Sequence, residues 1–153
     1  MHRLELRIPP LVLVALFAAA IVAASVWIPL VHVPVPGHRA LALLLVLAGL
    51  GVALAGVVAF QRAHTTVNPM APQRATAVVR TGLYRLSRNP MYLGLALALL
   101  GLAAWGSSLT GYALVPAFCA YLTRFQIKPE ERALGERFGP QLSQYTASVR
   151  RWL

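Results

Sequence analysis

The sequence predicts an all-α protein: a polytopic membrane bundle of about four transmembrane helices followed by a C-terminal amphipathic helix, within one domain of residues 1–153. Of these residues 58% are hydrophobic and only 12% are charged, whereas soluble domains carry about 25% charged residues. The charges are missing from long continuous stretches, which is typical of segments that cross a bilayer. We expect two spans in residues 1–60 and the other elements in residues 61–153.

The first expected span runs from about Ile8 to Leu30 and is too long for the apolar region of a signal peptide, so we expect a retained helix. The second, Leu41 to Phe60, has twenty uncharged residues. At about 1.5 Å per residue these cover the hydrocarbon core of ~30 Å. Within it Gly51, Ala55 and Ala59 recur every four residues, and such a stripe favours close packing against another helix.

Residues 61–90 are polar and contain five arginines with prolines and glycine, and a loop of this length in a small protein is often functional. Residues 91–123 are uncharged, but as one helix they would be about 50 Å long, which exceeds the bilayer. Gly106-Ser107-Ser108 interrupts them. We therefore expect a helical hairpin of Pro90–Trp105 and Leu109–Thr123, whose short arms are compatible with a tilted crossing or with partial insertion.

The last expected element is an amphipathic helix over Lys128–Phe138, which Gly139-Pro140 would stop. Its apolar stripe consists of Ile127, Leu134 and Phe138. Glu131 falls on the same stripe. Glu136 is spaced to pair with Arg132 at i, i+4.

The distribution of positive charge predicts the orientation. With four spans, the N-terminus, residues 61–90 and the C-terminal tail share one side and hold two, five and six Lys or Arg, against Arg39 alone on the other side. This asymmetry predicts an integral membrane protein with both termini in the cytoplasm. We expect it to lie in a bacterial inner membrane and to be surrounded by membrane lipids. The net charge of +10 does not indicate nucleic-acid binding, because the basic residues flank apolar spans and form no basic helical stripe.

The sequence also bears on two other functional classes. A proton-coupled transporter usually needs an acidic residue within a span, and these spans contain none. A membrane assembly factor, whose basic loops bind a partner or anionic lipid, remains an alternative. The single Cys119 and the four scattered histidines lack metal-ligand spacing, so no metal site is expected.

Two clusters on the cytoplasmic side are candidates for binding. Glu130 and Glu131 are adjacent carboxylates that should require a cation; a salt bridge to Arg88, Arg124 or Arg151 would satisfy this without any ligand. The second cluster is Arg88-Asn89-Pro90, where Asn89 is a good N-cap and Pro90 a good first helical residue. The free amides of that helix start can bind a carboxylate, although a capped helix with a snorkelling arginine is the simpler interpretation.

Taken together, the two clusters favour a zwitterionic ligand. They lie at opposite ends of the hairpin on the same membrane side, so they should be neighbours in space. One offers anion-binding groups and the other offers carboxylates. The amino-acid end of S-adenosylmethionine carries both complementary charges, and its sulfonium would tolerate the aromatic faces of Tyr84, Tyr92 or Trp105.

The residues of these two clusters and of several further stretches resemble the membrane methyltransferase superfamily of isoprenylcysteine carboxyl methyltransferases and phospholipid N-methyltransferases. The matching stretches are His64-Thr65-Thr66 with Pro69, Thr81-Gly82-Leu83-Tyr84-Arg85, Arg88-Asn89-Pro90-Met91-Tyr92-Leu93-Gly94, Glu130-Glu131 with Leu134, Phe138-Gly139, Tyr145, and Val149 with Arg151. They cover more than half of the chain. The resemblance implies S-adenosylmethionine as cofactor, held between the cytoplasmic ends of the last helices, and a lipophilic methyl acceptor taken from the membrane.

Carried over by position, the resemblance implies cofactor contacts at Tyr84, Arg88, Asn89, Pro90, Tyr92, Gly94, Glu130 and Glu131. Gly94 would leave room for the ligand. Asn89 stands where the isoprenylcysteine enzymes have His, Leu142 where many relatives have Tyr, and Leu83 where Pro is frequent. These departures bear on the acceptor more than on the cofactor.

The implied reaction is an in-line displacement of methyl from sulfonium by a nucleophile, in which alignment and exclusion of water supply most of the catalysis. Arg151 is the candidate to orient a carboxylate or thiolate acceptor. Glu131 or His64 is the candidate base for an amine acceptor. His64 is equally explained as an interfacial residue just past a span.

Overall fold

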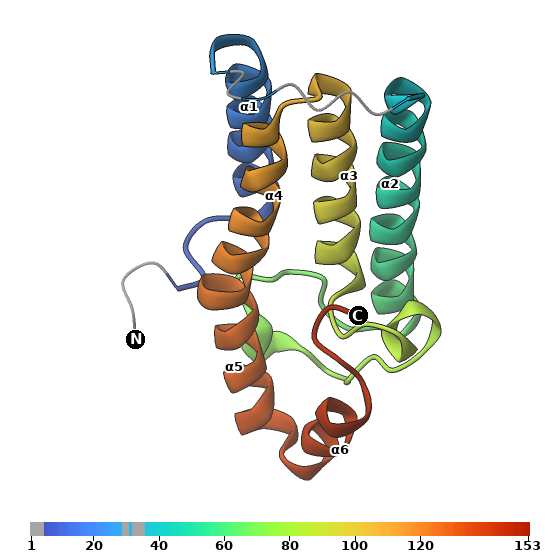
Figure 1. The fold of residues 1–153 in the computed structure, drawn as a ribbon. Coiled ribbons are helices and arrows are strands. Elements are labelled where there is room, and N and C mark those ends of the chain that lie inside the picture. Colours follow the sequence, from blue (N-terminus) through green and yellow to red (C-terminus); the bar gives the residue numbers. More distant parts are fainter. Residues whose placement is uncertain (1–4, 29–30, 32–35) are drawn as a thin grey trace.

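A computed structural model of the chain describes residues 5–28, 31 and 36–153. The described residues form helices and turns without strands, which confirms the all-α class. Four helices lie side by side: α1 (Pro10–Trp27), α2 (His38–Arg62), α3 (Pro90–Gly106) and α4 (Leu109–Leu122), as Figure 1 shows. The short helices α5 (Lys128–Phe138) and α6 (Pro140–Ser148) lie beyond one end of this bundle. Leu30, the expected end of the first span, lies outside the described residues.

Two helices, α1 and α2, are long and apolar enough to cross a membrane, and α3 is a shorter apolar helix. Both long helices expose large aliphatic side chains: Leu16 is 57% exposed, and Leu44 and Leu54 are each 64% exposed. Such continuous apolar surface is unfavourable in water and suits contact with lipid. The structure thus supports the membrane class, and the predicted number of four spans depends on α3 and α4.

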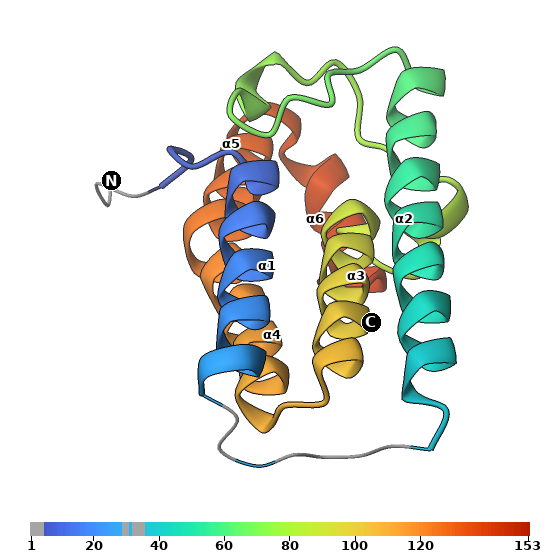
Figure 2. The same cartoon turned by 90° about the horizontal axis from the view of Figure 1, so that it is seen from above.

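The bundle is organised around α3, which contacts α2 on one side and α1 and α4 on the other (Figure 2). The core between α1, α3 and α4 is built from fully buried Ile21, Leu99 and Phe118. Phe17 of α1 meets Phe118 edge to face, with ring centroids 5.4 Å apart. Neighbouring aromatic and aliphatic side chains therefore hold these three helices together.

Glycines allow α2 and α3 to approach closely, but they are not the stripe expected from the sequence. A Cβ on Gly49 would lie 2.7 Å from the backbone nitrogen of Ala98, and one on Gly101 would lie 2.7 Å from the carbonyl oxygen of Ala42. Gly51 of the predicted stripe has no neighbour within 4 Å. The prediction was wrong because residues 49, 53 and 56 share one face of a 3.6-residue helix, whereas residues 51, 55 and 59 share a different one.

The predicted hairpin is confirmed. Helix α3 ends at Gly106, and Ser107 reverses the chain with a left-handed backbone (φ 48°) before α4 begins at Leu109. Ser107 and Ser108 are fully buried in the turn. Small polar residues allow this tight reversal, which a larger side chain would obstruct.

Helix α4 continues through a π-helical turn, η3 (Thr123–Ile127), directly into α5, so α5 extends the hairpin beyond the bundle. The bounds of α5 agree with the predicted Lys128–Phe138. Gly139 ends it with a positive φ of 48°, but the chain then forms α6, which the sequence pattern did not indicate. Pro140 occupies the first position of α6, where its missing N–H costs nothing, so the same residue both stops one helix and starts the next.

Candidate active site

The start of α3 and the start of α5 lie side by side at the α5/α6 end of the bundle. The Tyr92 hydroxyl in the first turn of α3 donates a hydrogen bond of 2.5 Å to Oε1 of Glu130 in α5. Arg88, just before α3, forms a 3.0 Å salt bridge with Glu131. The two clusters that the sequence singled out are therefore neighbours, because the hairpin returns the chain to the same end.

Glu131 is already paired with two cations. Besides Arg88, Arg151 binds it in a bidentate manner, with Nε 3.1 Å from Oε1 and Nη2 2.8 Å from Oε2. This hydrogen bonding raises the pKa of Arg151. The ligand-free alternative, a salt bridge to an arginine, is thus realised for Glu131.

One of the three arginines considered for the glutamate pair lies elsewhere, and the predicted ion pair of Arg132 with Glu136 is wrong. Arg124, a candidate partner for the glutamate pair, lies 3.5 Å from Glu5 instead. Arg132 also pairs with Glu5, at 2.6 Å, and not with Glu136, which is exposed. Glu5 attracts both arginines because it is nearly buried, with its side chain 9% exposed, whereas the i, i+4 pair would be fully solvated.

Glu130 differs from its neighbour because no cation is paired with it among the residues that the structure describes. Its Oε1 accepts hydrogen bonds from the Tyr92 hydroxyl and from the Gln126 amide. Burial raises the pKa of Glu130 to about 7, although both hydrogen bonds act to lower it. A carboxylate in this state favours a cationic ligand or a transferable proton.

Gln126 is a site residue that the sequence reasoning missed. It is only 3% exposed, and its amide nitrogen also donates to the Pro69 carbonyl oxygen at 3.0 Å. The π-helical turn at residues 123–127 carries it, and such turns are frequent at functional sites. The available signal was its position four residues before Glu130, at the end of an apolar stretch.

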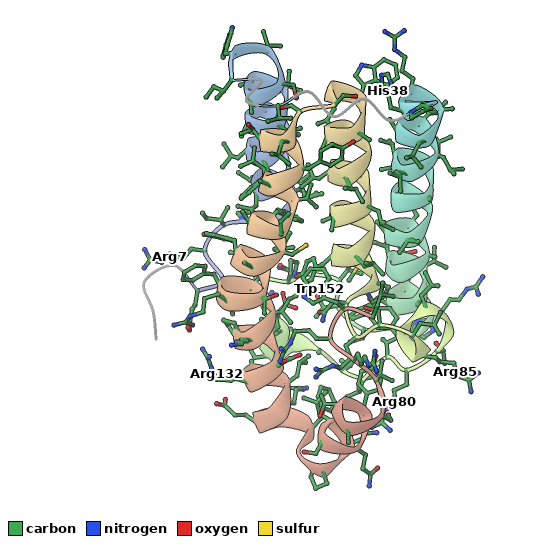
Figure 3. The ribbon with its side chains drawn as sticks, viewed as in Figure 1. Arg7, His38, Arg80, Arg85, Arg132 and Trp152 are labelled. Atoms are coloured by element: carbon green, nitrogen blue, oxygen red, sulfur yellow. The ribbon has the colours of Figure 1, made fainter. Side chains whose placement is uncertain are left out.

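The C-terminal tail crosses the start of α3. The Arg88 amide donates to the Arg150 carbonyl oxygen at 3.0 Å, and the Asn89 side-chain amide donates to the Arg151 carbonyl oxygen at 2.9 Å. The Trp152 indole donates to the Thr123 hydroxyl at 3.1 Å. Figure 3 shows Trp152 at the base of the bundle. Asn89 does occupy the N-cap position, but its side chain holds the tail and does not cap the helix.

Two polar atoms at the site are buried without a partner. Tyr84, in the turn η2 (Gly82–Arg85), is 3% exposed and its hydroxyl makes no hydrogen bond; the same holds for Nε of Arg88. The Tyr84 backbone is fixed by the Tyr145 hydroxyl, which donates to its carbonyl oxygen at 2.7 Å. Burial raises the pKa of Tyr145 to about 12, so its hydroxyl stays protonated. Unsatisfied buried polar atoms favour a ligand that pairs with them.

Three neighbouring spaces, which share some of their lining residues, surround the site. A junction cavity of about 110 Å³ is lined by Tyr84, Tyr92 and Glu130. An open polar groove of about 640 Å³ adjoins it; Arg88 and Glu131 line both spaces. On the other side lies an apolar cavity of about 420 Å³ between α1, α2, α3 and the loop at residues 67–70, which shares Tyr92 with the junction cavity.

Three predicted site residues lie away from these spaces. His64 is exposed at the end of α2 in a left-handed conformation (φ 49°) and lines none of the three. Gly94 faces α2, where a Cβ would lie 2.6 Å from the backbone nitrogen of Ala53, so it makes room for a helix and not for a ligand. Pro90 is buried at the first position of α3 and lines none of the three spaces. For Gly94 the helical periodicity explains the placement, because Tyr92 and Gly94 point to different sides of α3.

Comparisons with known proteins identify the family of this chain. The family model described as phospholipid methyltransferase matches residues 38–141, which include α2 to α5 and both site clusters. An uncharacterized protein of Haemophilus influenzae is 41% identical over 64 residues, which are 41% of this chain and 100% of that protein. No solved structure matches the chain significantly. Because the family model covers more than half of the sequence and confirms the predicted resemblance, this protein belongs to the phospholipid methyltransferase family of membrane methyltransferases.

Proposed function

We propose that this protein transfers a methyl group from S-adenosylmethionine to a lipophilic acceptor at the cytoplasmic face of the membrane. The observation that carries the proposal is Glu130, a buried carboxylate without a cationic partner among the described residues. It lines a cavity that shares wall residues with a polar groove and with an apolar cavity. A polar cofactor and an apolar acceptor can approach such a junction from opposite sides. Membership of a methyltransferase family supports the same reaction.

The residues present fit the cofactor. The orphaned Tyr84 hydroxyl and Arg88 Nε provide two unused donors, and Glu130 provides an unpaired acceptor for an ammonium group. Bound S-adenosylmethionine would supply an electrophilic methyl group on a sulfonium. Tyr84, Arg88, Tyr92 and Glu130 would hold it from the junction cavity. Glu131 acts indirectly, because its two arginines neutralise it and it keeps Arg88 in place.

The apolar cavity is the proposed acceptor site. Its walls are largely apolar, with Leu11 from α1, Val57 from α2 and Leu95 from α3. Pocket walls of this kind bind lipophilic chains by removing apolar surface from water. The acceptor's reactive group would then reach the junction cavity beside Tyr92, which lines both spaces.

The chain's own contribution to catalysis is alignment of the reacting groups and exclusion of water. The apolar lining of the junction cavity reduces contact of the reacting groups with water. For an amine acceptor, the role of base is not assigned to Glu130, because Oε2, which has no hydrogen-bond partner among the described residues, is proposed to hold the cofactor's ammonium group. His64 lies outside the cavity, and Glu131 is bound to Arg88 and Arg151, so neither is proposed as the base.

We further propose that α3 and α4 cross the membrane together with α1 and α2, with both termini in the cytoplasm. Arg80, Arg85 and Arg132 lie at the same end of the bundle as Trp152, opposite His38 (Figure 3). This arrangement agrees with the excess of cytoplasmic positive charge in membrane proteins. The site would then lie at the inner leaflet, where the soluble cofactor and a membrane lipid are both accessible.

Binding of S-adenosylhomocysteine tests the function. Isothermal titration calorimetry of the purified protein in lipid nanodiscs should show saturable binding, and Glu130→Gln should weaken it by about tenfold to a hundredfold, as expected for loss of a charge-assisted hydrogen bond. Glu136→Gln on the exposed face of α5 is the matched control and should bind like the wild type. Absence of binding by the wild type would refute the enzyme function and favour a non-catalytic transporter or assembly subunit.

A further inference from the structure

We infer that Gln126 is a positioning residue that orients the Glu130 carboxylate toward the cationic end of the ligand and links it to the wall of the apolar cavity. The inference rests on the proposed function, because it concerns the same site. Gln126 lies in the π-helical turn Thr123–Ile127 between α4 and α5, and Glu130 follows in the first turn of α5.

The hydrogen bonds determine how the Gln126 amide is oriented. Its nitrogen donates to the Pro69 carbonyl oxygen, which can only accept, so the NH₂ group and not the amide oxygen must face that side. The second proton of the same NH₂ group is then directed to Oε1 of Glu130. Because Gln126 is 3% exposed, water does not compete for these protons.

Two donors converge on one carboxylate oxygen. The Tyr92 hydroxyl and the Gln126 amide both donate to Oε1 of Glu130. Oε2 has no hydrogen-bond partner among the described residues. A cation or a proton that reaches Glu130 will therefore bind at Oε2, and Gln126 decides which oxygen is presented.

Among the described residues, only these two donors bind Glu130, because the nearby Tyr84 hydroxyl makes no hydrogen bond. Tyr84 from the turn η2 and Tyr92 from α3 face Glu130, and the adjacent Glu131 raises its pKa. The nearest arginines, Arg88 and Arg151, are both bound to Glu131. Loss of the Gln126 hydrogen bond should therefore raise the pKa of Glu130 further, since that bond lowers it in the intact site.

Gln126 also connects Glu130 to the acceptor side. Pro69, whose carbonyl oxygen it binds, lines both the junction cavity and the apolar cavity. A residue with only a structural role would satisfy the Pro69 carbonyl and leave the ionisation of Glu130 unchanged. The two roles are therefore separable by a pH profile.

The test measures S-adenosylhomocysteine affinity of the full chain in nanodiscs between pH 5.5 and 8, for the wild type, Gln126→Leu and Tyr92→Phe. Wild-type affinity should fall with acid around the Glu130 pKa of about 7. In Gln126→Leu this acid-dependent loss of affinity should move up by about one pH unit. Binding should then be about tenfold weaker than in the wild type at pH 6 and only about twofold weaker at pH 8. Tyr92→Phe, which removes the other donor to Oε1, should shift this loss in the same direction.

The inference would be overturned if Gln126→Leu lost affinity at the same pH as the wild type, or if its affinity were lower by the same factor at every pH. Either result would leave the proposed function intact. Wild-type protein that binds no S-adenosylhomocysteine at any pH would overturn both. If Gln126→Leu does not fold, Gln126→Asn is the second variant, because it keeps the amide but shortens its reach. It should show the same upward shift in the pH at which affinity falls. An unchanged pH dependence in Gln126→Asn would overturn the inference.

Discussion

Gly94→Ala offers a direct test of how α2 and α3 are packed. The added methyl group would meet the Gly49 carbonyl oxygen and would lie 2.6 Å from the backbone nitrogen and 2.9 Å from the Cβ of Ala53. Two of these atoms belong to the α2 backbone and cannot rotate aside. The substitution must therefore push α2 away from α3.

The expected cost follows from two opposing effects. Overpacking of a tight contact costs about 1–3 kcal/mol, and the upper end applies here because backbone must move. Replacing Gly by Ala within a helix returns about 1 kcal/mol. The net loss is about 2 kcal/mol, or about 4–8 °C in the unfolding midpoint of a chain of this size.

The assay is thermal unfolding of the wild type and the variants in one common detergent, with and without S-adenosylhomocysteine. Gly51→Ala is the matched control, because its new methyl group has no neighbour within 4 Å. It should be at least as stable as the wild type. Equal midpoints for Gly94→Ala and Gly51→Ala would refute the packing argument, and loss of ligand binding without loss of stability would return Gly94 to the binding site.

Three further outcomes follow from the site. Because burial raises the Glu130 pKa from 4.5 to about 7, the folded state favours its protonated form, so the unfolding midpoint of the wild type relative to Glu130→Gln should fall as the pH rises from 4.5 to 7; a constant difference would contradict this. Tyr145→Phe leaves the Tyr84 carbonyl oxygen without its donor and should cost about 1 kcal/mol, seen as a midpoint about 2–4 °C lower in thermal unfolding. His64→Gly removes the strain of a positive φ and should keep full affinity for S-adenosylhomocysteine in calorimetry, whereas a tenfold loss would restore His64 to the site.

Much of the fold could be predicted because it depends on local pattern. Missing charges mark α1 and α2, the small residues at 106–108 mark the hairpin turn, and Gly139 marks the end of α5. The family motif likewise marked both site clusters before their contacts were known. These features are properties of short segments, so no knowledge of distant residues was needed.

Partner choice was decided only by the tertiary structure. Two adjacent glutamates look alike in the sequence, yet Glu131 receives two arginines and Glu130 receives none among the described residues. The sequence also could not predict which neighbour Gly94 faces, what Gln126 binds, or where the C-terminal tail runs. Each of them depends on distances between residues 20 to more than 60 positions apart, or on a single π-helical turn, and packing alone sets those distances. Local sequence patterns set which chemical groups reach this end of the bundle, and the packing of the helices sets which of those groups remain unpaired.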